Sequence, residues 1–414
     1  MSVRLGVLAE RNFRLFITGY ATSLVGSAMV PVALTFAVLQ EGHSASEVGF
    51  VLAAEAIPLV CLVLIGGVIA DRLSRRSVMI GSDGVRCVSE LLLAVLLLTG
   101  SPPLWVFILL AAVLGAGQAF FNPALTGLLP LVCSSGRLQQ ANALTGVATS
   151  AALIGGPALA GLIVATSGAG WAIAIDGLTY AVSAVCLALV QIPARAGHRD
   201  ESFAEQLRTG WAEFRSRSWL WVTVAQFSLF NVFAYSPFMV LGAVLADHVL
   251  GGAAVWGGIL AAQGVGSIIG GLVVLRVRMG RPLIAVVLGL VCFSAPVALL
   301  AARAPAAAIA AAAAVAGAGF AVSDALWSTT LQQQVPAAAL SRVSAYDWLG
   351  SIAFVPLGYA LAGPLAGAIG ISATLWLGAG WAVIGGAAAL SFPSVRHLRA
   401  SPSKTQANRD VGVW

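Results

Sequence analysis

The chain has 414 residues, of which 59% are hydrophobic and only 9% are charged, and its formal net charge is +6. A soluble domain carries about 25% charged residues, so this chain has too few charges to cover the surface of a water-soluble globule. The composition excludes a soluble fold and indicates an integral membrane protein.

Apolar runs recur along the whole chain, and each is long enough to cross a hydrocarbon core about 30 Å thick. The sequence therefore predicts an all-α membrane protein with twelve transmembrane helices. They span residues 14–39, 46–70, 77–99, 103–131, 139–166, 170–193, 219–246, 253–275, 281–302, 305–333, 343–367 and 370–392. The first run is too long for a signal-peptide core and has no clear small-residue cleavage site, so we interpret it as a spanning helix.

Basic residues predict the orientation, because loops rich in Lys and Arg stay in the cytoplasm. With the N-terminus inside, twenty of the 22 basic residues fall in cytoplasmic segments, while Arg303 lies outside and Arg86 lies within a helix. We therefore expect both termini in the cytoplasm. The net charge needs no nucleic-acid partner, because basic loops set the topology and can contact anionic lipid headgroups.

The sequence contains no motif that indicates a catalytic, metal-binding or nucleotide-binding site. The five cysteines lie in or beside apolar segments without a CxxC pair, which argues against a disulfide framework and a metal site. No phosphate-binding loop or nucleophile motif appears. We expect no enzymatic activity, no cofactor and no ATP hydrolysis.

The chain divides into two similar halves. VLGAGQAFFN at 113–122 is echoed by VAGAGFAVSD at 315–324, and IGGVIADR at 65–72 by IGGLVVLR at 269–276, at nearly the same offset. These echoes indicate an internal duplication, with a polar linker between the copies. The expected domains are an N-terminal six-helix bundle at 1–193, a cytoplasmic linker at 194–218, a C-terminal bundle at 219–392 and a cytoplasmic tail at 393–414.

The loop after the second apolar run reads GGVIADRLSRR. Its Gly67, Asp71, Arg72, Arg75 and Arg76 resemble the loop signature of the major facilitator superfamily. The resemblance implies a gating latch, in which Asp71 accepts hydrogen bonds from a helix N-terminus and the arginines reach carboxylates of the other half. The alternative is that these arginines only hold the topology.

The helix at 139–166 contains SAALIGGPALAG, which resembles the exporter signature of the same superfamily. Pro157 removes a backbone donor, while Gly155, Gly156 and Gly161 let a neighbouring helix approach closely. Such a helix can hinge and seal, and the alternative is an ordinary membrane proline. The segment at 355–364 is a looser counterpart in the second half.

Charged residues inside the helices are the candidates for proton coupling, since ionised groups in hydrocarbon are costly and usually face the bundle interior. Asp83, Arg86 and Glu90 are spaced three and four apart, so they share one helix face. Their functional interpretation is a switch in which Arg86 exchanges partners as a carboxyl protonates. The alternative is a static set of salt bridges that fixes packing.

Three further acids lie in apolar runs with no basic neighbour at helical spacing, namely Glu55, Asp176 and Asp324. Each is a candidate proton carrier, although Glu55 could instead be hydrated near the outer mouth. All four histidines fall in loops or tails, so a proton relay must use carboxylates.

The substrate cavity is expected between the helices at 14–39, 103–131, 219–246 and 305–333. Aromatic rings with a few amides suit a bulky amphiphilic ligand, and the alternative for each ring is a contact with lipid. The candidates are Phe120, Phe121, Asn122, Gln226, Phe230, Asn231, Tyr235 and Trp327.

The whole chain resembles the twelve-helix drug:proton antiporter branch of the major facilitator superfamily, which includes macrolide-efflux proteins and siderophore exporters. VGSAMVPVALTF near the N-terminus, DGVR at 83–86 and IDGLTYAVSA at 175–184 carry this resemblance. It implies two pseudo-symmetric six-helix bundles around a central site. It also implies proton-coupled export of a small amphiphile by a monomer in the bacterial inner membrane. The alternatives are a metabolite importer, a lipid translocator or a membrane sensor that transports nothing.

Overall fold

The computed structural model describes residues 6–191, 211–276 and 279–399, and every regular element in these ranges is a helix. The N-terminal half (6–191) contains six long helices and two short 3-10 turns. They are η1 (Gly6–Ala9), α1 (Arg11–Gln40), α2 (Ala45–Arg72), α3 (Arg75–Thr99), α4 (Leu104–Val132), η2 (Ser135–Arg137), α5 (Leu138–Ser167) and α6 (Ala169–Leu189).

The C-terminal half (211–399) also contains six spans, but three of them are interrupted. The seventh span consists of α8 (Ser218–Phe230), the π-helix η3 (Asn231–Tyr235), α9 (Ser236–Leu245) and the π-helix η4 (Ala246–Leu250). The others are α10 (Ala253–Val274), α11 with α12 (Pro282–Val291, Ser294–Ala301), α13 (Ala306–Gln334), α14 with α15 (Ala337–Ile352, Val355–Ile369) and α16 (Ile371–Ser391), followed by α17 (Pro393–Arg396).

Eleven helices in the described ranges are both long enough and apolar enough to cross a membrane. The twelfth predicted span is α3, whose 25 residues are sufficient in length but include charged side chains. These charges point inward, because the exposed side of α3 carries apolar residues such as Val88, which is 67% exposed. The predicted twelve-helix fold is therefore confirmed, with α3 as a span whose apolar sequence also contains buried charges.

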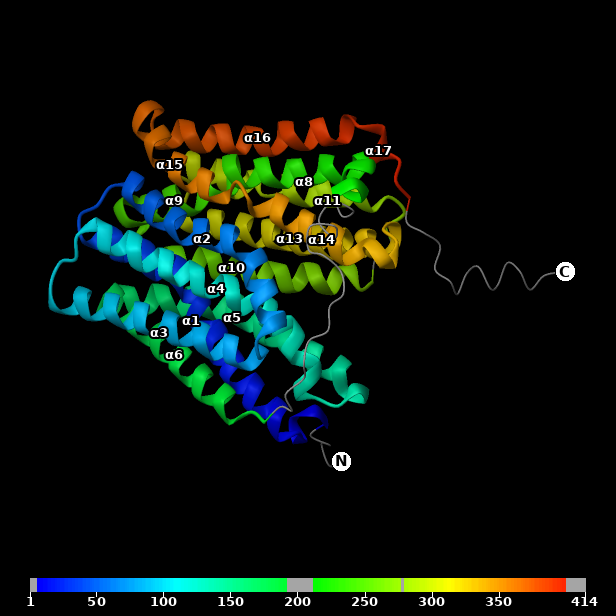
Figure 1. The fold of residues 1–414 in the computed structure, drawn as a ribbon. Coiled ribbons are helices and arrows are strands. Elements are labelled where there is room, and N and C mark those ends of the chain that lie inside the picture. Colours follow the sequence, from blue (N-terminus) through cyan, green and yellow to red (C-terminus); the bar gives the residue numbers. More distant parts are fainter. Residues whose placement is uncertain (1–5, 192–210, 277–278, 400–414) are drawn as a thin grey trace, which may run out of the picture.

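The two ends of the bundle differ in how the halves meet. Val7 donates its amide to Gln140, and Arg399 accepts a hydrogen bond from Gln334, so both ends of the described chain lie at one end, here called the termini side. The opposite end, with the loop after α1 and Arg303, is the far side. Figure 1 shows the helices running between these two ends.

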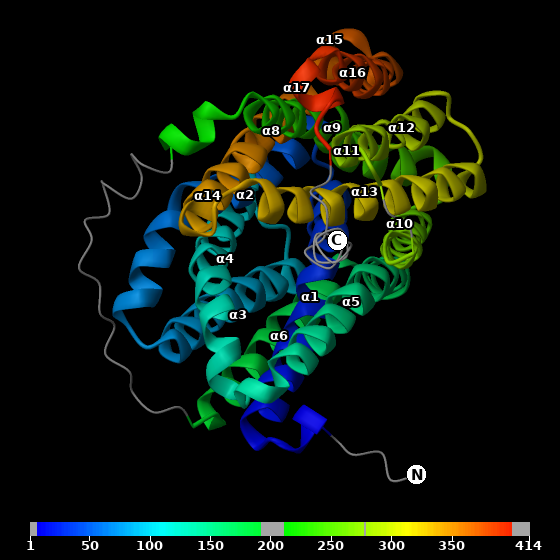
Figure 2. The same ribbon diagram turned by 90° about the vertical axis from the view of Figure 1, so that its right-hand side faces the viewer.

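At the far side the halves share one hydrophobic core, which includes Phe36 and Leu110 from the first half and Phe238 and Leu300 from the second. At the termini side this core splits into two separate clusters, each confined to one half. In Figure 2, which looks from the termini side, α1, α5 and α6 lie below while α11, α13 and α16 lie above. The halves are therefore joined at the far side and part toward the termini side.

Close helix packing across the far-side junction depends on glycine. Gly161 of α5 leaves no room for a side chain against the carbonyl of Ala253 in α10, and Gly257 of α10 likewise abuts the carbonyl of Pro157. On the other flank, Gly363 of α15 packs directly on the backbone of Ser46 in α2. These backbone contacts hold the two halves together at the far side.

The repeated small-residue step has the same packing role in both halves. Gly115 of α4 lies against the carbonyl of Glu55 in α2, and Gly317 of α13 lies against the carbonyl of Gln263 in α10. Gly117 contacts α3 at Arg86, and the equivalent Gly319 contacts α11 at Gly289. Each pair contacts equivalent neighbours, as expected for two pseudo-symmetric bundles.

Candidate functional site

The polar face of α3 lies inside the N-terminal half, between α4 and α6. Asp83 is fully buried, and Arg86 and Glu90 are each only 4% exposed. Their spacing places them along one side of the helix, while apolar side chains occupy the outer side. α3 is thus an inverted amphipathic helix, as expected for a span whose exposed side faces hydrocarbon and whose polar side faces protein.

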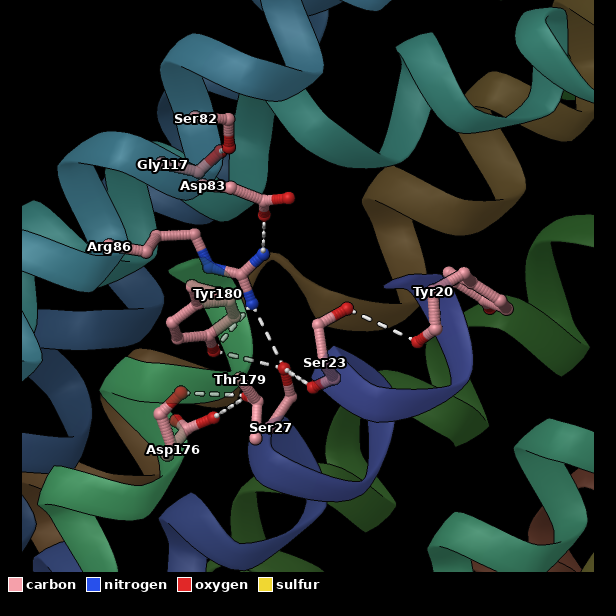
Figure 3. Close-up of polar contacts among 10 residues, drawn as sticks. All are labelled: Tyr20, Ser23, Ser27, Ser82, Asp83, Arg86, Gly117, Asp176, Thr179 and Tyr180. Atoms are coloured by element: carbon pink, nitrogen blue, oxygen red, sulfur yellow. Dashed lines mark hydrogen bonds and ion pairs between the residues drawn. The ribbon is translucent and has the colours of Figure 1, made fainter. Parts of the chain in front are cut away.

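Arg86 connects three helices (Figure 3). Its Nη2 donates to Tyr180 Oη at 2.6 Å and to Ser27 Oγ at 3.0 Å, and Nη1 lies 3.5 Å from Asp83 Oδ1. The guanidinium carbon also lies 3.9 Å from the centre of the Tyr180 ring and 5.3 Å from that of Phe121. We call Ser27, Asp83, Arg86, Glu90, Asp176 and Tyr180 the Arg86 cluster.

The carboxyl groups of this cluster are incompletely paired. One oxygen of each of Asp83, Glu90 and Asp176 has no hydrogen-bond partner within the described part of the chain. Asp176 does accept a hydrogen bond from Thr179 Oγ1 at 3.1 Å (Figure 3). Burial of an unpaired carboxylate is costly, and one guanidinium cannot neutralise three carboxylates.

Glu90 is the acid of α3 that lies nearest the far side. It lines a small, largely apolar pocket between α1, α3 and α4, whose other walls are Leu34, Ser89, Leu93, Leu110, Ala111 and Leu114. Glu90 forms no ion pair with any described residue, although Arg86 lies within electrostatic range of it.

The other two sequence-predicted acids lie outside this cluster. Glu55 is half-buried on α2, and it forms no hydrogen bond or ion pair with any described residue, although it is within electrostatic range of Arg86 and Glu90. Asp324 is exposed on α13 in the other half. The structure thus assembles Asp83, Arg86, Glu90 and Asp176 and leaves Glu55 and Asp324 apart.

The arginines of the loop motif bind backbone carbonyls. Arg75 Nη1 donates to the carbonyl of Gly127 in α4 at 2.6 Å, and Arg76 Nε donates to that of Leu187 in α6 at 2.8 Å. Arg76 Nη2 also reaches Ala188, so it caps the C-terminus of α6. In this conformation Arg76 bonds within its own half. The surroundings of Gly67 and the side chains of Asp71 and Arg72 lie outside the described part of the structure.

The proline-containing helix α5 remains continuous through Pro157. Gly156 packs on Ala28 of α1, whereas an added side chain at Gly155 would meet nothing within 4 Å. With the Gly161 contact to α10, these small residues place α5 between its own half and the opposite one.

The cavity candidates divide by exposure. Phe120, Asn122, Asn231 and Tyr235 are half-buried, whereas Phe121, Gln226, Phe230 and Trp327 are buried. Phe230 packs edge-on against Phe293, with ring centroids 5.3 Å apart, within the shared far-side core. The half-buried members are therefore the better placed to meet a ligand.

Sequence reasoning missed Ser27 and Tyr180, which hold the guanidinium of Arg86, and Asp347 in α14. The carboxyl oxygens of Asp347 accept hydrogen bonds from Trp327 Nε1 at 3.0 and 3.1 Å. Tyr180 follows Asp176 by one helical turn, which was an available signal.

Two bundles of six helices, joined at one end and enclosing buried ionisable groups, are the architecture of a membrane transporter. The sequence matches the family model of the Major Facilitator Superfamily over residues 15–352. The chain belongs to this superfamily, as its motifs predicted.

Among its relatives are drug-efflux proteins. Macrolide efflux protein A of Streptococcus pyogenes is 26% identical over 223 residues, which cover 53% of this chain and 55% of that protein. Multidrug efflux pump Tap of Mycolicibacterium fortuitum is 26% identical over 393 residues, covering 91% and 94%. The chain thus matches about half the length of the macrolide-efflux relative and nearly all of Tap. The predicted resemblance to the drug-efflux branch is confirmed.

Solved structures show the same fold. A bacterial homologue of the human lysosomal transporter Spinster, in an inward-facing and unoccupied conformation, has a TM-score of 0.71 at 13% identity. The match covers 94% of this chain and 98% of that one.

Proposed function

We propose that this protein is a proton-coupled exporter of small amphiphilic compounds. The observation that carries the proposal is the Arg86 cluster, in which three buried carboxyl groups share a single guanidinium. Charge balance requires some of these carboxyls to hold protons while they remain buried. A site that must bind and release protons as its surroundings change is suited to coupling. The efflux activity of the relatives supports export as the direction.

The orientation follows from the basic residues. Arg75, Arg76, Arg137, Arg217, Arg281 and Arg396 lie at the ends of helices on the termini side, while Arg303 lies on the far side. We therefore place the termini side in the cytoplasm of a bacterial cell. The conformation in which the halves part toward the termini side is then open to the cytoplasm, ready to receive an intracellular compound.

A partner exchange of Arg86 provides the coupling step. Arg86 pairs with Asp83. Glu90 lies about 10 Å from Asp83 along the helix axis, at roughly 1.5 Å per residue. Protonation of Asp83 would remove its attraction for the guanidinium and favour a turn toward an ionised Glu90. Because Arg86 also bonds α1 and α6, such a turn changes contacts between three helices.

Accumulation assays test this proposal in an efflux-deficient bacterial host. Cells expressing the protein should accumulate less of at least one amphiphilic drug, and a protonophore should abolish the difference. Arg86→Gln should abolish export, whereas Arg217→Gln, which removes a half-buried arginine paired with Glu213 outside the Arg86 cluster, should retain it. Protonophore-insensitive export, or full export by the Arg86 variant, would contradict the proposal.

A further inference from the structure

Glu55 lies at the inner edge of the seal between the two halves. On α2, Val48, Val51 and Leu52 belong to the shared far-side core, and Glu55 follows Leu52 by almost one turn toward the termini side. Tyr235 and Tyr359 pack against the edge of the same core from the second half. The three side chains therefore occur where the joined region ends and the halves begin to part.

Helix contacts bring these three residues to one place. Gly49 of α2 packs on the carbonyl of Tyr359 in α15, so the two helices touch at the backbone one to two turns from Glu55. Gly358 of α15 packs on Ser236 at the start of α9, beside η3, which carries Tyr235. Tyr359 lies within electrostatic range of both Tyr235 and Glu55.

The polar atoms of this group have no hydrogen-bond partner among the described residues. Across residues 6–191, 211–276 and 279–399, no hydrogen bond or ion pair involves the Glu55 carboxyl or the hydroxyls of Tyr235 and Tyr359. The carboxyl of Glu55 and the hydroxyls of Tyr235 and Tyr359 are also absent from the fully enclosed unpaired atoms, which include those of Glu90 and Asp176. Three half-buried polar groups without a described partner at one junction suggest a ligand that supplies their partners.

The chemistry of the group selects the ligand. A carboxylate attracts a cation, and aromatic faces within about 6 Å of a cation add to that attraction. The surroundings are apolar, since Phe293 lies 5.9 Å from the Tyr235 ring, centroid to centroid, and Phe230 packs on Phe293. An organic cation with an apolar body satisfies both features, whereas an anion would meet only repulsion from Glu55.

We infer that Glu55, Tyr235 and Tyr359 form the subsite that binds the positively charged group of a lipophilic organic cation. The inference rests on the proposed export function and narrows its substrate class. It assigns Glu55 to recognition rather than to coupling. Arg86, Glu90 and Asp176 also act on Glu55 electrostatically, but Arg86 is already bound by Asp83, Tyr180 and Ser27. Because the subsite takes groups from both halves, a bound cation would also contact both.

Equilibrium binding to the purified full-length protein tests the subsite. The two probes are tetraphenylphosphonium and tetraphenylborate, which are matched in size and opposite in charge. The wild-type protein should prefer the cation, and Glu55→Gln should weaken cation binding about tenfold without weakening the anion. Glu55→Asp should retain part of the affinity, and Tyr235→Leu should reduce it more than Tyr235→Phe, since only the latter keeps the ring.

Asp247→Asn is the matched control, because Asp247 is a carboxylate in η4 near the far-side end of the seventh span. It should leave the affinity for tetraphenylphosphonium unchanged. Equal cation affinity in the wild type and the Glu55→Gln variant would overturn the inference, as would a wild type with no preference for the cation. The assay contains no proton gradient, so failure of proton-driven export would not alter it, and loss of the subsite would not disprove export.

Discussion

At the scale of single residues, the Tyr180 hydroxyl is the shortest contact of Arg86 and also bonds Ser27 Oγ at 2.9 Å. Tyr180→Phe keeps the ring under the guanidinium but removes this acceptor. A buried hydrogen bond to a charged group is worth about 1.5–3 kcal/mol, so we expect a lower thermal unfolding temperature together with reduced export. Thermal unfolding in detergent checks the first effect and drug accumulation the second.

Tyr20→Phe is the matched control, since the Tyr20 ring stacks on Phe16 and its hydroxyl bonds no described residue. Its unfolding temperature should remain near that of the wild type. An equal shift in both variants would mean that the Arg86 cluster does not depend on Tyr180.

Glu10, which precedes α1, forms a pH-sensitive set of hydrogen bonds with Ser134 and Arg137 outside the membrane spans. Hydrogen bonds from Ser134, at 2.7 Å from Oγ and 2.9 Å from the amide, lower the pKa of Glu10 below its usual 4.5, with help from Arg137. A carboxyl with a lowered pKa stabilises the fold above the unfolded value, and this contribution is lost as pH falls through the lower, folded value.

We therefore expect acidification below about pH 4.5 to destabilise the wild type more than a Glu10→Gln variant. Unfolding temperatures of both proteins, measured across this pH window, would show the difference shrinking as pH falls. A constant difference at all pH values would contradict this role for Glu10.

At the scale of helices, the contact between α5 and α10 should govern closure of the far side. Gly161→Leu places a side chain where the Ala253 carbonyl lies, whereas Gly155→Leu adds the same side chain where nothing lies within 4 Å. We expect the first variant to open the far side and the second to leave it closed.

Labelling of a cysteine at Val164, a buried member of the shared core, measures this opening in a background without the native cysteines. A charged thiol reagent should react faster when Gly161 is replaced than when Gly155 is replaced. Similar rates in the two variants would show that the glycine contact does not hold the far side shut.

The sequence predicted the helices well, because a membrane span is determined largely by local apolarity. The ends of α1 and α6, for example, fall within a few residues of the predicted ones. The sequence also predicted that Asp83, Arg86 and Glu90 share one helix face, since this depends only on helical periodicity. The partners of Arg86 could not be predicted, because Ser27 and Tyr180 come from helices whose relative rotation the sequence does not specify.

The π-helix at Asn231–Tyr235 and the break between α14 and α15 could not be predicted from the sequence either. Asn231 Nδ2 donates to the Ser351 carbonyl at 2.9 Å, and Ser228 donates to that of Gly350, so the two irregularities support each other. Such tertiary hydrogen bonds leave no periodic signal. Asp347 was missed for a related reason, as its partner Trp327 lies on another helix.

At the scale of the whole molecule, the two halves differ in the kinds of side chain that they bury. The first half holds the buried charges of the Arg86 cluster, and the second has three interrupted spans rich in aromatic contacts. Coupling in one half and recognition at the junction would allow protons and substrate to act on different elements of one rocking structure.

Substrate-induced proton movement in inside-out membrane vesicles tests the central claim most directly. With the lumen acidified, addition of a drug identified by the accumulation assay should drive protons out and dissipate the pH gradient, read with a pH-sensitive dye. We expect this signal from the wild type and the Arg217→Gln variant and none from Arg86→Gln. A gradient that the drug leaves intact in wild-type vesicles, or dissipates equally in Arg86→Gln vesicles, would contradict proton-coupled export through the Arg86 cluster.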